Sequence, residues 1–263
     1  MTAEPQEREE LLVDLRDDSV GIITLNRPHA ANTFTAALVD GFEKTVGDLV
    51  RKRARVLVIT GNGRHFCAGA DLKAVAAGHG PRLGDTRFID QLEDIRIPVI
   101  AALNGSAIGG GCELALACDL RVMASGATIG LPEVRFGGLP AGGGTQRLPR
   151  IVGIGRAKQM LMLGTPVPAD EALAMGLVNA VVPSDQVLPH AIELARELCR
   201  RPAYALESVK FLVNRSTDLD LSSGLKLEIY VARKMATSEQ RKDAQRQAGE
   251  AEGGAYAGIF KET

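Results

Sequence analysis

The sequence of 263 residues contains no tryptophan, and aromatic side chains make up only 4% of it. It also lacks an excess of either charge, because 31 Lys and Arg residues balance 32 Asp and Glu residues to leave a formal net charge of −1. Proteins dedicated to nucleic acid or to anionic membrane surfaces usually carry a strong basic excess. The charge balance therefore argues against nucleic acid and membrane as partners.

Long apolar runs and a targeting pattern are also missing. No run approaches the roughly 20 apolar residues that span a bilayer, and the first ten residues, MTAEPQEREE, are acidic and hold no apolar stretch. The four cysteines form no CxxC pair, and a chain of this length needs no disulfide framework. We expect reduced core thiols and a cytoplasmic protein.

Several common catalytic motifs are absent. The sequence has no GxxxxGK[ST], no GxSxG and no HExxH, and its four histidines show no ligand spacing. GNGRHF follows a predicted strand and resembles GxGxxG, but Phe66 stands where the third glycine belongs. These absences disfavour a phosphate-binding loop, a serine hydrolase, a metal site and a dinucleotide site.

Glycine, in contrast, is abundant, at 29 of the 263 residues, or about 11% against a usual ~7%. Much of this surplus lies in three loops, at Gly61–Gly69, Gly105–Gly111 and Gly137–Gly144. Glycine lets the backbone approach a ligand closely because it has no side chain. The loops are therefore candidates for a site built from backbone groups.

The pattern of strands and helices predicts an α/β fold. Two short strands are followed by a helix that Thr35 caps, and then by near-continuous apolar runs typical of buried parallel strands. A single amphipathic helix is expected from about Thr145 to Leu163, and the last ~70 residues read as helices. We place a core carrying the site at residues 1–195 and a helical part at 196–263. The expected strands are Leu11–Leu15, Val20–Leu25, Val56–Thr60, Pro98–Leu103 and Leu120–Ala124.

Two glutamates lie in unusually apolar surroundings. Glu113 stands in GGGCELALACD and Glu133 in IGLPEVRFGG. Each could simply interact favourably with the dipole at the start of a helix. Two partly buried carboxylates near glycine-rich backbone could also act as an acid and a base, because burial and mutual repulsion would keep at least one protonated near neutrality.

The glycine loops offer two backbone donors. Gly110 opens a predicted helix, so its N–H has no partner within that helix. Ala70 ends FCAGA, directly before another helix, and has a similarly free N–H. Two such donors can form an oxyanion hole, although each glycine could equally mark a tight turn.

Four segments together resemble the crotonase superfamily, also called the enoyl-CoA hydratase/isomerase family. The resemblance covers most of the chain, and the segments occur in the family's order. They are NRPHAAN at Asn26–Asn32, GNGRHFCAGADLK at Gly61–Lys73, NGSAIGGGCELALACDLRVMA at Asn104–Ala124, and GLPEVRFGGLPAGGGTQRLPRIVG at Gly130–Gly153.

The resemblance implies a crotonase-type spiral core of repeated ββα turns, with a C-terminal helical part that packs a trimer. It implies a homotrimer, or a homohexamer built as a dimer of trimers. The family's oxyanion hole falls on the N–H groups of Ala70 and Gly110, and its catalytic glutamates fall on Glu113 and Glu133. The substrate is then an acyl-CoA thioester, and no separate cofactor is expected because coenzyme A is part of that substrate.

The implied reaction is the addition of water across the C2=C3 bond of a trans-2-enoyl-CoA to give a 3-hydroxyacyl-CoA. Glu113 would deprotonate the water that attacks C3, and Glu133 would deliver a proton to C2. The family's PGAGGTQRL reads PAGGGTQRL here, so Ala141 replaces a glycine near the expected water. The residues that match coenzyme A-binding positions are Arg27, Ala68, Asp71, Leu72 and Lys73.

Other functions stay open at this point. On the same fold, an enoyl-CoA isomerase or a decarboxylase would use a similar site, although the two intact glutamates favour a hydratase. A non-catalytic, RNA-binding module is disfavoured by the near-neutral charge. A dinucleotide oxidoreductase would need a nicotinamide or flavin site, which the sequence supports poorly.

Overall fold

The computed structural model describes residues 9–78, 80 and 84–237, and these fall into two units that divide between Arg200 and Arg201. Helix α8 (Val187–Cys199) packs against strands of the first unit's large sheet. The expected boundary after residue 195 lies inside this helix, five residues before the division. The second unit contains α9 (Ala203–Arg215) and α10 (Leu221–Ala236).

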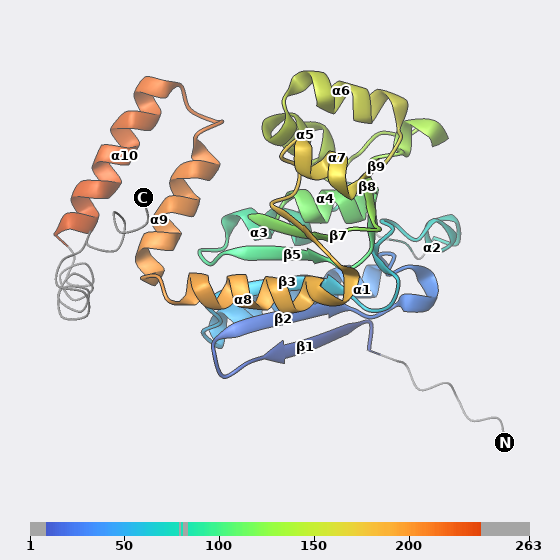
Figure 1. Ribbon diagram of the computed structural model, residues 1–263, viewed down its shortest axis with the longest axis horizontal. Helices are drawn as coiled ribbons and strands as arrows, with labels where there is room; N and C mark the ends of the chain where they lie inside the picture. Colours follow the sequence, from blue (N-terminus) through green and yellow to red (C-terminus); the bar gives the residue numbers. More distant parts are fainter. Residues whose placement is uncertain (1–8, 79, 81–83, 238–263) are drawn as a thin grey trace. The chain divides into compact units, whose positions relative to one another are not determined.

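The large sheet has six strands in the order β1-β2-β3-β5-β7-β10 (Figure 1). β1 and β2 form an antiparallel hairpin, and every other neighbouring pair is parallel. This arrangement confirms the expected α/β fold with parallel pairing. The strands are β1 (Leu11–Leu15), β2 (Val20–Leu25), β3 (Val56–Gly61), β5 (Val99–Leu103), β7 (Leu120–Ala124) and β10 (Ala180–Val182).

A second sheet of four short strands has the order β4-β6-β8-β9. Its first three members each follow directly on a strand of the large sheet and lead into a helical segment, so the chain repeats a ββα turn. Sequence patterns did not indicate these strands, because two or three residues are too few to show a period. They are β4 (His65–Cys67), β6 (Ser106–Ile108), β8 (Thr128–Gly130) and β9 (Val167–Pro168).

The helices begin and end mostly where local signals predict. The side chain of Thr35 accepts a hydrogen bond from Leu38 N and caps α1 (Ala36–Arg51). The helix expected from Thr145 to Leu163 is instead two helices, because Gly153 adopts a left-handed φ of +82° between them. Besides α8, α9 and α10, the helical segments are η1 (Pro28–Ala30), α1 (Ala36–Arg51), α2 (Leu72–Ala76), α3 (Arg87–Asp94), α4 (Gly110–Leu116), η2 (Glu133–Phe136), α5 (Gly144–Val152), α6 (Ile154–Leu163), α7 (Ala169–Ala174) and η3 (Ser184–Gln186).

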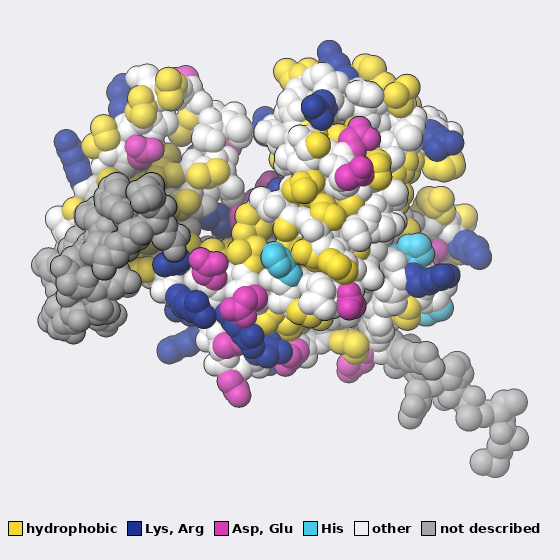
Figure 2. All heavy atoms as spheres, in the orientation of Figure 1, with side chains coloured by type: hydrophobic (Ala, Val, Ile, Leu, Met, Phe, Trp, Pro, Cys, Tyr) yellow, Lys and Arg dark blue, Asp and Glu magenta, His cyan; other side chains and the backbone are white. Residues whose placement is uncertain are grey.

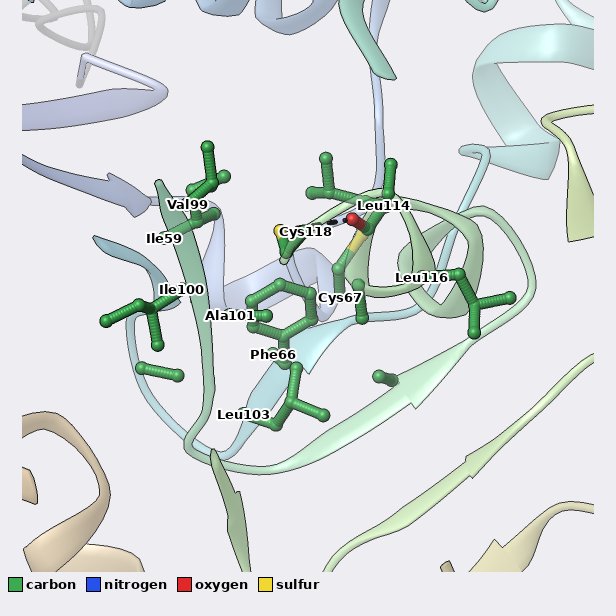
Figure 3. Packing of buried hydrophobic residues seen from close by; sticks show 14 of the residues in the cluster. Ile59, Phe66, Cys67, Val99, Ile100, Ala101, Leu103, Leu114, Leu116 and Cys118 are labelled. Carbon is green, nitrogen blue, oxygen red and sulfur yellow. Dashed lines mark hydrogen bonds between the residues drawn. The ribbon is translucent and has the colours of Figure 1, made fainter. Parts of the chain in front are cut away.

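The core between the two sheets is built from aliphatic, small and thiol side chains around few rings. Phe66 is fully buried and lies among side chains from β3, β5 and α4 (Figure 3). Cys118 Sγ lies 3.4 Å from the carbonyl oxygen of Leu114, its hydrogen-bond acceptor. Burial raises the pKa of the Cys67 thiol to about 12, so this sulfur stays protonated. Cys67, Cys112 and Cys118 are free and buried, so the expected core position is confirmed for these three cysteines.

Candidate active site

The second sheet brings three separate loops to one place. β4, β6 and β8 are parallel neighbours, so their carboxyl ends meet at the same edge. Ala70 comes three residues after β4, Gly110 two residues after β6, and Glu133 three residues after β8. The short strands therefore gather residues that are far apart in the sequence.

The loops that carry Ala70 and Gly110 are in backbone contact. A Cβ atom added to Gly69, whose φ is +83°, would lie only 2.7 Å from the backbone nitrogen of Gly110. Gly110 is the first residue of α4, so its N–H has no acceptor within that helix. The geometry therefore brings the two expected donors close to each other.

Phe34 fixes the direction in which the Ala70 segment faces. Its N–H donates to the carbonyl of Gly69 at 2.8 Å, and its carbonyl accepts from the N–H of Asp71 at 3.1 Å. In such a parallel bridge the N–H of the intervening residue, Ala70, points to the opposite side. The Phe34 ring also lies close to Gly110, since a Cβ added there would be 3.0 Å from Cε2.

Glu113 is held in α4 with a defined carboxylate orientation. Its side chain is only 5% exposed, and Oε1 accepts hydrogen bonds from Gly142 N at 2.7 Å and Gly144 N at 2.9 Å. Burial raises the pKa of Glu113, while these two N–H groups and the charge of Arg147 oppose that rise. The carboxylate form of Glu113 is therefore stabilised by two backbone N–H donors and one positive charge.

Glu133 has a different environment at the start of η2. A Cβ added to Gly109 would lie 3.2 Å from Glu133 Oε1, so the carboxyl group faces the turn that leads to Gly110. Its Oε2 is buried and has no hydrogen-bond partner in the part of the chain that the structure describes. Burial raises the pKa of Glu133, and the negative charge of Glu113 raises it further. These surroundings favour the protonated form.

The two carboxyl groups are thus suited to opposite tasks. Backbone donors stabilise a carboxylate at Glu113, whereas an unpartnered oxygen and a negative neighbour stabilise a neutral acid at Glu133. Environments that separate the pKa values of two neighbouring carboxyls produce an acid and a base at one pH. The arrangement can accept a proton at one atom and donate a proton at another.

Two of the expected coenzyme A-binding residues, Arg27 and Asp71, use their side chains for hydrogen bonds and ion pairs within the protein. The guanidinium of Arg27 contacts Glu10 at 3.0 Å, the carbonyl of Thr33 at 2.6 Å and Asp71 at 3.1 Å. Asp71 also caps α2, because Oδ1 accepts from the N–H groups of Lys73 and Ala74. These contacts hold the pKa of Asp71 below its usual range, with the Ala74 hydrogen bond the largest favourable cause.

The other three expected residues, Ala68, Leu72 and Lys73, lie in or beside the Ala70 loop, and the last two have exposed side chains. The N–H of Ala68 donates to the carbonyl of Ala31 at 3.0 Å. Leu72 is 72% exposed and Lys73 is also exposed, both on α2. The structure places all five residues around one loop, with Arg27 and Asp71 as its internal support.

Comparison with known proteins is consistent with this geometry. The family model described as enoyl-CoA hydratase/isomerase matches residues 16–252. The chain belongs to the enoyl-CoA hydratase/isomerase family. It is 41% identical over 239 residues to the 2,3-dehydroadipyl-CoA hydratase of Escherichia coli K12, covering 88% of this chain and 92% of that protein. It is 36% identical over 236 residues to the short-chain-enoyl-CoA hydratase of Clostridium acetobutylicum, covering 87% and 90%.

Solved structures support the same membership. The crystal structure of an enoyl-CoA hydratase from Mycobacterium tuberculosis H37Rv matches with a TM-score of 0.86 at 32% identity, covering 94% of this chain and 97% of that one. The crotonase-type core of repeated ββα turns and the helical C-terminal part are therefore confirmed. As a member of the enoyl-CoA hydratase/isomerase family, the protein is an enzyme that acts on CoA thioesters.

Sequence reasoning named the Gly137–Gly144 loop as a candidate, but it did not indicate which of its N–H groups bind Glu113. The N–H donors to Glu113 come from Gly142 and Gly144, which are 29 and 31 residues away in the chain. A Cβ on Gly144 would approach Leu131 Cδ1 and Pro140 Cβ to 2.8 Å, so this position has no space for a side chain. The run of three glycines after Ala141 was the available signal. Ala141 itself is exposed.

The described residues show neither a metal-ligand cluster nor a membrane span. No group of three His, Cys, Asp or Glu side chains among them could hold a metal ion. None of the described helices is long and apolar enough to cross a membrane.

Proposed function

We propose that this family member is a 2-enoyl-CoA hydratase, a hydro-lyase that converts a trans-2-enoyl-CoA to a 3-hydroxyacyl-CoA. The observation that carries the proposal is the pair of carboxyl groups at Glu113 and Glu133, which stand in opposite environments beside two backbone donors. Hydration needs both a base for water and an acid for carbon. The two glutamates supply both.

The thioester carbonyl would bind to the N–H groups of Ala70 and Gly110. Attack at C3 moves electron density through C2 onto the thioester oxygen, so negative charge grows there. Fixed donors aimed at that position stabilise the charge, and each contributes roughly 2.7–4 kcal/mol to the transition state. Because these donors are backbone groups, most substitutions of side chains leave this contribution intact.

The glutamates complete the addition. Glu113 takes a proton from the water molecule while the oxygen of that water forms a bond to C3. Glu133 gives its proton to C2, which consumes the electron pair released from the double bond. Water has then been added, with hydroxyl on C3 and hydrogen on C2, and proton exchange with solvent returns both glutamates to their first states. The proposed reaction needs no cofactor besides the coenzyme A of the substrate.

Coenzyme A would lie along the Ala70 loop. We propose that Ala68, Leu72 and Lys73 contact it directly and that Asp71 and Arg27 hold the loop in place. The exposure of Leu72 and Lys73 beside this loop supports the proposal, as does the ion pair between Arg27 and Asp71.

A panel of enoyl-CoA thioesters tests the reaction. The panel contains a short straight-chain substrate, longer and branched ones, and a dicarboxylic one of the kind named for the Escherichia coli relative. We expect loss of enoyl-thioester absorbance and formation of a 3-hydroxyacyl product with at least one of them, with kcat/KM ranking the acyl groups. Formation of a 3-enoyl isomer without hydration would instead identify an isomerase, and carbon dioxide release from a carboxylated acyl-CoA would identify a decarboxylase.

We also propose that the protein assembles as a homotrimer or as a homohexamer made of two trimers. Large apolar side chains are exposed on the helices of the second unit, where water contact is unfavourable (Figure 2). A neighbouring subunit would cover them. The exposed residues on this unit are Val209, Phe211, Val213, Leu219, Leu221, Leu225, Ile229 and Tyr230.

Light scattering coupled to size exclusion tests the assembly. The expected mass is three or six times 27.9 kDa. Leu225→Glu and Ile229→Glu together place two charges on this apolar surface and are expected to shift the protein to smaller species, because burying an unpaired charge is costly. A monomer in the unmodified protein, or an unchanged mass in the double variant, would contradict the proposal.

A further inference from the structure

One arginine of α5 connects the loop that holds Glu113 to a helix from another part of the chain. The side chain of Arg147 is only 12% exposed. Its Nε and Nη2 donate to the two carboxylate oxygens of Glu93 at 2.8 Å each, and Nη2 also contacts Asp90 at 2.7 Å. Both carboxylates lie on α3, so Arg147 attaches α5 to α3 through a forked ion pair.

The fourth contact of Arg147 reaches the site. Its Nη1 donates to the carbonyl oxygen of Gly142 at 2.8 Å, and the N–H of the same Gly142 donates to Glu113 Oε1 at 2.7 Å. The guanidinium occupies the space of a missing side chain, because a Cβ on Gly143 would lie 2.0 Å from Nη1. Asp90 and Glu93 are thus linked to Glu113 through one arginine and one residue's backbone.

We propose that Arg147 is a positioning residue that holds the Gly142–Gly144 loop against α3, so that the loop's two N–H groups keep the Glu113 carboxylate oriented toward the reacting water. The inference rests on the proposed hydratase function. Arg147 touches no reacting atom in this scheme, and it acts only through Gly142 and Glu113.

Only a guanidinium can make all of these contacts. Its planar fork binds both oxygens of Glu93 while a remaining N–H reaches the Gly142 carbonyl. Lysine keeps the charge but has a single nitrogen on a flexible stem, so it would serve one or two of these acceptors. Arg147→Lys therefore removes the forked hydrogen-bond geometry while it keeps the positive charge.

The charge of Arg147 gives a second observable effect. The titratable groups that interact with Glu113 are Glu133 from η2, the thiol of Cys112 in α4 and Arg147 from α5. Burial raises the pKa of the Cys112 thiol, so it is uncharged near neutrality. Arg147 is the positive group in this set, and its removal is expected to raise the pKa of Glu113.

The experiment compares Arg147→Met and Arg147→Lys with a matched control on the same helix. Arg150→Met is that control, because Arg150 is exposed and its side chain donates a hydrogen bond to the carbonyl of Gln146 on the same helix. For each protein we would measure kcat and KM for hydration, the melting temperature, and the infrared titration of the Glu113 carboxyl group without substrate. The Glu113→Gln variant identifies the infrared band.

Arg147→Met is expected to lower kcat about 100-fold with KM changed less than about threefold, since a shift of about 1 Å in a catalytic group costs this much. Glu113 should titrate at higher pH in this variant, and the acidic limb of the kcat/KM profile should move to higher pH with it. In Arg147→Lys the Glu113 carboxyl group should titrate near the same pH as in the unmodified protein, while kcat should be roughly tenfold lower than in that protein. Arg150→Met should change none of these.

The proposal is overturned if Arg147→Met folds with normal kcat and an unshifted Glu113 titration. If this variant does not fold, Glu93→Gln is used, because it keeps one acceptor and removes one charge; a normal kcat there would equally overturn the proposal. If the unmodified protein hydrates no enoyl-CoA, the proposed function fails, and the substrate-free titration still decides whether Arg147 controls Glu113.

Discussion

Replacing Glu133 by Gln is expected to lower kcat for hydration by about 1,000-fold, because general acid catalysis contributes roughly 10²–10⁴-fold. An amide has nearly the shape of the carboxyl group but cannot give up a proton to C2. Affinity for a saturated acyl-CoA should change little, since the proposed binding groups for the thioester are the backbone N–H donors of Ala70 and Gly110. Steady-state kinetics and calorimetric titration measure the two effects separately.

The pH dependence of activity tests whether the protonated form of Glu133 is the active one. Burial and the charge of Glu113 raise the pKa of Glu133, so the protonated acid persists to higher pH than in an ordinary glutamate. Activity should fall on the alkaline side as Glu133 loses its proton, and Glu133→Gln should lack that limb. An alkaline limb that survives the substitution would mean that another group titrates.

Glu113→Gln is the comparison for this result. It should also lose activity, because in the proposed mechanism its carboxylate accepts the water proton, and the remaining limb should then be the alkaline one. The double variant should lose little more than either single variant, since residues that act as one unit have non-additive effects. Strictly additive losses, or a large drop in acyl-CoA affinity, would contradict the assigned roles.

Gly69→Ala is expected to have the second large effect, through the oxyanion hole. The added Cβ would lie 2.7 Å from Gly110 N and 3.1 Å from the carbonyl oxygen of Ile108, and both are backbone atoms that cannot rotate away. The loops must separate, which displaces one of the two donors. We expect kcat to fall about 100- to 1,000-fold, the loss associated with one donor, together with weaker binding of acyl-CoA.

Gly176→Ala is the matched control for this substitution. Both glycines have a left-handed φ, +83° at Gly69 and +74° at Gly176, but a Cβ on Gly176 meets nothing within 4 Å. The two variants therefore share a backbone strain of about 1–2 kcal/mol, while only Gly69→Ala moves the donors. The control should melt a few degrees lower with normal kcat. Equal losses of kcat in both variants would show that strain, and not the oxyanion hole, explains the effect.

Local signals in the sequence were enough to predict the large sheet. The run from Val56 to Thr60 is apolar on both faces, which is typical of a strand covered on both sides, and β3 is buried along its whole length. The cap at Thr35 was predictable because capping depends on a few adjacent residues. The two glutamates were noticeable for a similar reason, since each is a carboxyl group flanked directly by apolar residues.

Features that depend on distant residues could not be predicted in this way. The break at Gly153 is local, but it was not predicted because an isolated glycine inside a helical pattern is often tolerated without a break. Arg27 matched a coenzyme A-binding position, yet its guanidinium is bonded to Glu10, Thr33 and Asp71. No local pattern indicated a role for Arg147, because its partners on α3 are 54 and 57 residues away.

By itself the sequence determined the α/β class, the buried strands and the residue types of the site, because these follow from hydrophobic period, capping and composition over short stretches. The tertiary structure decided what those residues can do. Three strands too short to show a pattern bring the Ala70, Gly110 and Glu133 loops together, and two N–H groups from a remote glycine loop distinguish Glu113 from Glu133. The protonation preference of each carboxyl follows from its neighbours in space, and the sequence does not list those neighbours.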